Sequence, residues 1–195
     1  KNLGHSVISV VPALTGLKAK EKVYKALAGI RTEASVRLFI DGQMVDEHRG
    51  EVQLADYGIS GIPVFQLSGQ AAYGLLYGHK VVCMLDFFPD WTKERLIQFL
   101  KERKNHFHGQ PGEVFETGLL NRKLIHECIK LAGGRENRLP KMEQLAEICK
   151  HFPATIIESR GFAQAQVCAG GVNLAEIEPE NCESLIHPGL YIIGE

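Results

Sequence analysis

The sequence predicts an α+β protein in which an antiparallel β-barrel-like domain is interrupted by a small helical bundle. Three observations support this fold class. Short apolar runs recur at intervals of roughly 10 residues up to residue 91, which is typical of antiparallel barrels or sandwiches. The apolar period then lengthens to that of a helix from 92 to 152, and alternation returns after 153. Turn-forming glycines, prolines and an Asp-Gly pair separate the segments.

The first part, residues 1–91, is expected to form most of the barrel. Asp41-Gly42 predicts a tight hairpin turn between two strands. GISGIP at 58–63 predicts a cluster of turns, followed by a short helix that tolerates Pro63 in its first turn. Strands are expected over 5–11, 23–29, 35–41, 44–48, 51–57 and 79–87.

The middle part, residues 92–151, predicts three helices and carries a net charge of +4. Thr92 and Thr117 are the expected N-caps of the first two helices, and Pro140 is expected to open the third. Gly133-Gly134 is expected to end the second helix. Because each apolar stripe is narrow, we expect a satellite bundle with a small core of its own.

The last part predicts strands again, over 154–160 and 163–169, with a break at Gly170-Gly171. A final strand is expected over 189–195. Because strands lie on both sides of the helical block, we expect residues 152–188 to complete the barrel.

Composition excludes several classes of protein. An apolar fraction of 45% and a net charge of -1 over 195 residues argue against disorder. The sequence contains no run of about 18 apolar residues, so no transmembrane helix is predicted. A pI near 6.8 gives no support to nucleic-acid binding. Five cysteines without a CxxC pair favour a reducing compartment, so we expect a cytoplasmic protein. The ends at Lys1 and Glu195 lead us to expect a piece of a larger chain.

Two glycine clusters are the main candidates for a functional site. Gly58, Ser60 and Gly61 form one, and Gly170 with Gly171 forms the other. Glycine permits positive φ and close approach of a backbone or a flat ligand, although sharp turns alone would also explain both clusters. Neither cluster is a dinucleotide or phosphate-binding motif, and the histidines have no metal-ligand spacing. Asp86 is expected to cap the following helix.

Several segments in order resemble a bacterial family of flavoproteins, the BaiN-like NAD(P)/FAD-dependent oxidoreductases, which includes proteins labelled aminoacetone oxidases. The segments that carry the resemblance are LGH at 3–5, VPALTGL at 11–17, GEVQLADYGISGIPVFQLSG at 50–69, MLDFFPD at 84–90, AQVCAGGVNLAEI at 165–177 and ESLIHPGLYIIGE at 183–195. Two positions depart from the family pattern: Cys168 stands where threonine is common, and Asn181-Cys182 replaces Thr-Met.

The resemblance implies that this chain is the insert domain between two halves of an FAD-binding domain. Gly170, Gly171 and Val172 would then lie near the flavin ring. Gly194 and Glu195 would lie beside the cofactor where the strand at 189–195 re-enters the FAD domain. Gly58, Ser60 and Gly61 would lie at a barrel edge that faces the substrate cleft.

The resemblance also implies FAD in the full-length protein, NAD(P)H as a possible electron donor, a small-molecule substrate and the FAD-binding domain of the same chain as partner. Neither a nucleic-acid nor a membrane partner is expected. The fragment alone is expected to bind no FAD and to be inactive, and no catalytic residue is identified. Two alternatives stay open: a free-standing barrel that binds a small ligand or a protein, and a hydrolase that uses Ser60 with a histidine, although the G-x-S-x-G spacing is absent.

Overall fold

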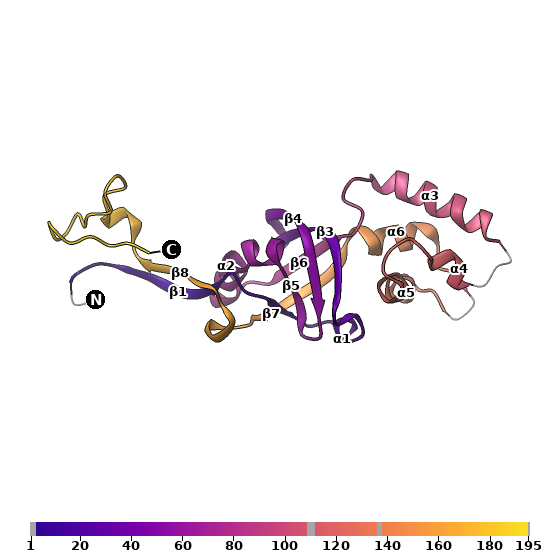
Figure 1. Cartoon of the computed structure of the whole chain (residues 1–195), viewed down its shortest axis with the longest axis horizontal. Coiled ribbons are helices and arrows are strands. Elements are labelled where there is room, and N and C mark those ends of the chain that lie inside the picture. Colours follow the sequence, from indigo (N-terminus) through magenta and orange to yellow (C-terminus); the bar gives the residue numbers. More distant parts are fainter. Residues whose placement is uncertain (1–2, 109–111, 136–137, 195) are drawn as a thin grey trace.

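The computed structural model describes residues 3–108, 112–135 and 138–194. The molecule is elongated, and its three parts follow one another along the long axis (Figure 1). A two-stranded ribbon and the C-terminal segment form one end, a β-barrel forms the middle and a group of helices forms the other end. The predicted α+β class is therefore confirmed.

Six antiparallel strands form a closed barrel in the order β2-β5-β4-β3-β6-β7. The strand β7 follows the helical segment in sequence and pairs with both β6 and β2, which closes the barrel. Strands from both sides of the helical segment thus share one sheet, as predicted. The bounds are β2 (Leu17–Ala19), β3 (Ile30–Ile40), β4 (Gln43–Ala55), β5 (Gly58–Gly61), β6 (Val81–Asp86) and β7 (Phe152–Ser159).

The hairpin between β3 and β4 confirms the predicted Asp41-Gly42 turn. Both residues have positive φ, +49° and +83°, which is the conformation of the tight turn that matches strand twist. The Asp41 carboxylate accepts hydrogen bonds from the Lys80 backbone N–H at 2.8 Å and from His79 at 2.7 Å. These bonds stabilise the ionised form, so the pKa of Asp41 lies below its ordinary value.

Two expectations for the first part are wrong. Residues 23–29 contain a one-turn helix, α1 (Val23–Leu27), whose buried face is Tyr24 and Leu27, three residues apart. A short apolar run cannot by itself distinguish helix from strand. The separate strands expected over 44–48 and 51–57 are one strand, β4, because its pairing with β3 continues through Gly50, which lies opposite Ala34. A Cβ on Gly50 would lie 3.2 Å from the ring of Pro63.

The GISG cluster forms strand β5 rather than a group of turns, which is a further correction. Its glycines allow neighbouring strands to approach closely. A Cβ on Gly58 would lie 2.6 Å from the backbone nitrogen of Ala19, and one on Gly61 would overlap the carbonyl oxygen of Glu51. Strand β5 lies between β2 and β4 in the closed barrel. The cleft-facing position that the resemblance implies for its residues stays a prediction.

Helix α2 (Ile62–Leu76) starts directly after β5 and covers the end of the barrel nearest the ribbon (Figure 1). Pro63 lies in its first turn, as predicted. Val64, Leu67 and Ala71 lie at spacings of three and four residues and are fully buried against the barrel interior.

The other end of the barrel carries the helices α3 (Lys93–His106), α4 (Gly112–Glu116), α5 (Arg122–Leu131) and α6 (Met142–Lys150). Thr92 caps α3 as predicted, by accepting from the Arg95 N–H at 3.2 Å. The predicted Thr117 cap of α5 is wrong: Asn121 accepts from the Lys123 N–H at 3.0 Å. Helix α5 ends at Leu131 with Ala132 as its C-cap, and Gly133 follows with a φ of +87° and donates to the Lys130 carbonyl oxygen, as glycines after a helix end commonly do.

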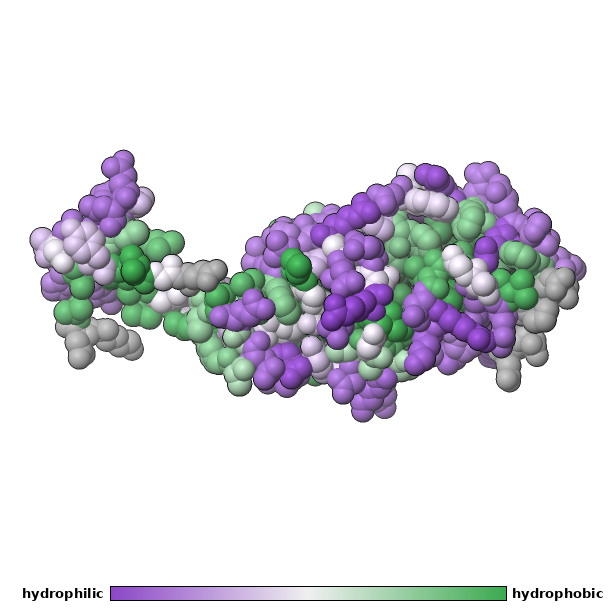
Figure 2. All heavy atoms as spheres, in the orientation of Figure 1, coloured by the Kyte–Doolittle hydropathy of each residue, from purple (hydrophilic) through white to green (hydrophobic). Residues whose placement is uncertain are grey.

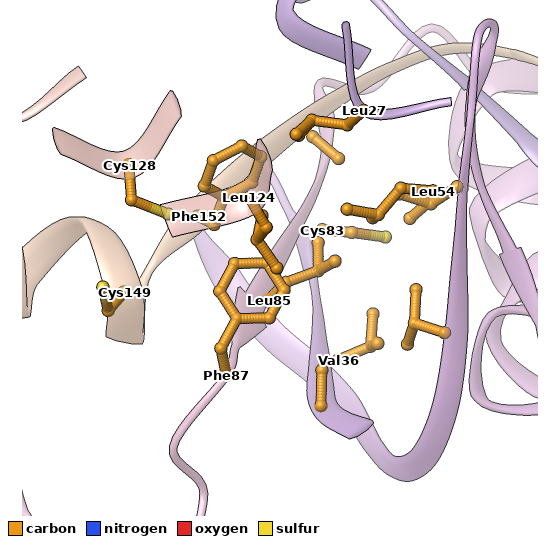
Figure 3. Close-up of a cluster of buried hydrophobic side chains, with 14 of the residues drawn as sticks. Leu27, Val36, Leu54, Cys83, Leu85, Phe87, Leu124, Cys128, Cys149 and Phe152 are labelled. Atoms are coloured by element: carbon orange, nitrogen blue, oxygen red, sulfur yellow. The ribbon is translucent and has the colours of Figure 1, made fainter. Parts of the chain in front are cut away.

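The expected separate core of the helical part is wrong as well. The buried apolar side chains of the barrel and of the helices form one continuous cluster. Figure 3 shows the junction, where Phe87, Phe152 and Leu124 of α5 gather beside Leu85 of the barrel. The ring centroids of Phe87 and Phe152 are 5.4 Å apart. Narrow helix stripes suffice because the helices close the barrel end and do not enclose a core alone.

A buried ion pair fixes the connection between the barrel and the helices. Asp86 ends β6 and Lys150 ends α6, with side chains 7% and 11% exposed and 2.7 Å between carboxylate and ammonium. The ammonium also donates to the carbonyl oxygens of Phe88 and Trp91. Asp86 therefore does not cap α3 as predicted. It accepts from the Phe88 N–H at 2.9 Å and pairs with Lys150.

The last part differs from the expected pattern at two places. Gly170-Gly171 does not break a strand, because β8 (Val167–Val172) runs through both residues after a 3-10 turn, η1 (Phe162–Gln164). The strand expected over 189–195 is not formed in its described residues, where Tyr191 makes an isolated bridge to Glu183. A second 3-10 turn, η2 (Leu174–Glu176), follows β8. Among the described residues, no helix is both long and apolar enough to cross a membrane.

Leu124→Ala tests the shared core. Leu124 is fully buried in the cluster, so its truncation is expected to lower the free energy of unfolding by about 2–5 kcal/mol. Urea unfolding followed by circular dichroism should keep a single transition for barrel and helices. Leu131→Ala is the control on the same helix, because Leu131 is exposed. Loss of helical signal ahead of a stable barrel would contradict the shared core.

Lys150→Met tests the ion pair. The substitution removes the nearer of the two cations at the buried Asp86 carboxylate and leaves only Arg37, whose guanidinium is 3.6 Å away, so it is expected to cost up to about 3–5 kcal/mol in chemical unfolding. Lys130→Met is the matched control, because its pair with Glu127 has a lysine that is 55% exposed, and surface pairs contribute about 0–1 kcal/mol. Equal effects of the two substitutions would show that Asp86 is solvated.

Candidate functional site

The Gly170-Gly171 cluster lies on a two-stranded ribbon that extends beyond the barrel. Strand β1 (Val7–Ala13) pairs antiparallel with β8, and the register places Gly171 opposite Ile8 and Val172 opposite Val7. The ribbon continues the β2–β7 pair of the barrel, since β1 precedes β2 and β8 follows β7. The glycines are therefore in the half of the ribbon that is far from the barrel.

The two glycines of this cluster have different surroundings. Gly170 has a φ of +95°, and a Cβ there would overlap the carbonyl oxygen of Ser9 and lie 2.6 Å from the hydroxyl oxygen of Tyr73. Gly171 has a φ of +119°, and no atom lies within 4 Å of a Cβ built on it. Gly170 is thus explained by packing within the chain, whereas Gly171 combines a glycine conformation with open space.

The C-terminal segment folds back onto residues before β1. Ser184 accepts from the backbone N–H groups of Ile186 and His187, so its hydroxyl proton is directed to His5 Nε2 at 2.8 Å. His5 and Ser184 are both buried. Glu176 accepts from the backbone N–H of Ser6 at 2.9 Å. Segments almost 180 positions apart in sequence are therefore held together at one end of the molecule.

This end of the molecule exposes many apolar side chains. Figure 2 shows apolar residues gathered on the ribbon and on the segment after it. A ribbon of two strands has marginal stability in water, and contiguous exposed apolar surface of this kind marks an interaction site. The exposed residues are Leu3, Val7, Ile8, Val10, Leu174, Leu185, Ile186, Tyr191 and Ile193.

The predicted site residues are not all brought together. Gly170, Gly171 and Val172 are on the ribbon, and Gly194 is exposed in the C-terminal segment at the same end (Figure 1). Glu195 lies outside the described residues. Gly58, Ser60 and Gly61 are in the barrel wall, where contacts with neighbouring strands account for both glycines and Ser60 is buried. Their role at a substrate cleft stays a prediction.

The other reactive side chains do not converge on a second site. Within residues 3–108, 112–135 and 138–194, no hydrogen bond joins Ser60 to a histidine, and no group of three or more His, Cys, Asp or Glu could hold a metal. Three of the free cysteines are buried in the core, as their apolar surroundings predicted. The sequence did not reveal that α2 contacts the ribbon. Gly69 and Tyr73 make these contacts, and their spacing of four residues, which puts them on one helix face, is the pattern that could have indicated them.

Comparisons with known proteins identify the family. Residues 11–167 match the family described as HI0933-like protein barrel and H2TH domain. The chain belongs to this HI0933-like family. It is also 36% identical over 201 residues to the 3-dehydro-bile acid delta(4,6)-reductase of Clostridium scindens. This alignment covers all of this chain and 49% of the reductase. The HI0933-like chain thus spans about half the length of this curated relative, and the predicted resemblance to BaiN-like flavoproteins is confirmed.

The HI0933-like match and the geometry divide the chain in the same way. The match begins at Val11 and ends at Val167, so it contains the barrel and its helices. The free half of the ribbon and the C-terminal segment lie beyond it, although the bile-acid reductase match includes them.

Thiol labelling tests the placement of the cysteines in the HI0933-like chain. Burial raises the pKa of Cys83 to about 12, and a hydrogen bond from the Cys128 thiol to Cys149, together with burial, raises the pKa of Cys128. These thiols stay protonated at pH 8, whereas Cys168 is exposed. We expect Ellman's reagent to modify Cys168 in seconds to minutes and the three buried thiols only after unfolding; a native Cys168→Ser protein that still reacts rapidly at Cys83 would contradict this.

Proposed function

We propose that this chain is the insert domain of an FAD-dependent oxidoreductase, in which it covers the flavin and shapes the substrate cleft. The observation that carries the proposal is the apolar end formed by the ribbon and the C-terminal segment. Residues 3–7 and 173–194 lie together there, so both connections to a parent domain would enter at one place. An inserted domain needs this arrangement, and the exposed apolar side chains need a partner.

The ribbon has features that fit a flavin. Gly171 offers open space beside a backbone in a glycine conformation, which allows close approach of a flat ring. Gly171 and Val172 would contact the cofactor from the ribbon, and Gly194 would contact it from the C-terminal segment. FAD would supply hydride transfer, with NAD(P)H as electron donor, while the protein positions the cofactor and excludes water.

The filled barrel interior disfavours the alternative of a barrel that binds a small ligand. Side chains from all six barrel strands are fully buried inside it, among them Val36, Leu38, Leu54 and Cys83. A substrate would therefore bind outside the barrel, between it and the FAD domain. A 3-dehydro-bile acid, the compound in the relative's name, is the first substrate to test. The free thiols support a cytoplasmic location.

Expression of the full-length protein tests the proposal directly. We expect a yellow protein whose visible absorption spectrum is that of a bound flavin. The 195-residue chain alone should remain colourless after gel filtration with FAD, because a few ribbon contacts cannot offset a loss of freedom of about 4–15 kcal/mol. A colourless full-length protein that gains no absorption with added FAD would refute the proposal.

Gly171→Val in the full-length protein tests the contact with the flavin. A branched side chain would fill the open space and strain the backbone, so we expect a shifted flavin band or loss of FAD. Gly118→Val is the matched control, because Gly118 has a φ of +78°, is equally open and lies in the helical part. Unchanged spectrum, flavin content and turnover in Gly171→Val would exclude this residue from the cofactor site.

A further inference from the structure

We propose that Tyr73 is a positioning residue that clamps the ribbon to α2 and thereby sets the place of Gly170-Gly171 at the flavin. The inference rests on the proposed function, since it concerns the same glycines. Tyr73 lies one turn before the end of α2, and its hydroxyl donates to the carbonyl oxygen of Ser9 on β1 at 2.9 Å.

Helix α2 follows the ribbon from the barrel outward through a series of contacts. Ser68 Oγ accepts from the backbone N–H of Thr15 at 3.2 Å. Small residues come next: a Cβ on Gly69 would lie 3.5 Å from Ala13 and 3.6 Å from Ala169. Among hydrogen bonds between described residues of α2 and the ribbon, the Tyr73 bond is nearest the free end of the ribbon.

The Tyr73 hydroxyl also lies so close to Gly170 that a side chain on residue 170 would clash with it. It lies 2.6 Å from where a Cβ of Gly170 would be, so the absence of a side chain at Gly170 leaves room for the hydroxyl beside the ribbon. The same hydroxyl therefore touches both β1, through Ser9, and β8, through Gly170. Gly171, with the open face, is the next residue along β8.

The clamp links the two glycine clusters of the sequence. Gly61 ends β5 and is the N-cap residue of α2, and its close approach to Glu51 fixes the start of the helix in the barrel wall. The helix then holds Gly170 through Tyr73 at its other end. Because an α-helix has a fixed rise per residue, the place of Gly61 in the barrel wall sets where Tyr73 contacts the ribbon.

The test compares Tyr73→Phe with Tyr77→Phe, a matched control on the same helix. The Tyr77 ring stacks on that of Tyr73 at 6.2 Å, and no hydrogen bond of its hydroxyl occurs among the described residues. Hydrogen exchange in the 195-residue chain should become about 2- to 10-fold faster in Tyr73→Phe at residues 8–10 and 170–172, the range given by loss of one hydrogen bond. Exchange in β3 and β6 should stay unchanged.

The second measurement uses the full-length protein. Tyr73→Phe should keep its FAD but show a shifted flavin band and about 2- to 10-fold slower flavin reduction by NADH or NADPH. Tyr77→Phe should behave as wild type. Faster ribbon exchange with an unchanged spectrum and reduction rate would overturn the positioning role while leaving the insert function intact. Equal exchange in both variants would overturn the clamp, and a wild-type protein unable to bind FAD would instead overturn the proposed function.

Discussion

The closure of the barrel by β7 is the constraint on which the rest of the molecule depends. This strand follows some 60 residues of helical sequence and hydrogen-bonds to both β6 and β2. The helices must therefore leave and return at one end of the barrel, where Phe87 and Phe152 join their apolar faces to the barrel interior. Their placement follows from the return of the chain, and their stability follows from the core that they share with the strands.

The same closure creates the ribbon at the opposite end. Strands β2 and β7 pair in the barrel, so the segments before β2 and after β7 leave it side by side and pair as β1 and β8. Leu14 and Gly161, with φ of +49° and +75°, redirect the two chains at the junction. The ribbon thus extends the β2–β7 pair beyond the barrel, but no further strand pairs with β1 or β8 among the described residues. Its apolar side chains are therefore exposed.

The barrel and the helices share one buried core, whereas the ribbon end exposes apolar side chains. The buried pair of Asp86 and Lys150 and the filled barrel interior hold the barrel and the helices in one packed unit. The ribbon end carries the open glycine and the unpartnered apolar side chains. If the chain serves as the proposed insert domain, this end would face the parent domain, and α2 would relate the position of the ribbon to that of the barrel.

The sequence by itself determined the α+β class, the Asp41-Gly42 hairpin, the helical interruption and the buried cysteines, because these depend on local turn chemistry and apolar periodicity. Tertiary structure alone decided that residues 23–27 are helical, that GISG is a strand and that Asp86 pairs with Lys150. Each of these depends on which distant backbone or charge lies opposite. The two glycine clusters were recognisable, but their surroundings were not, since a glycine in sequence does not reveal whether a strand, the Tyr73 hydroxyl or open space occupies the place of its side chain.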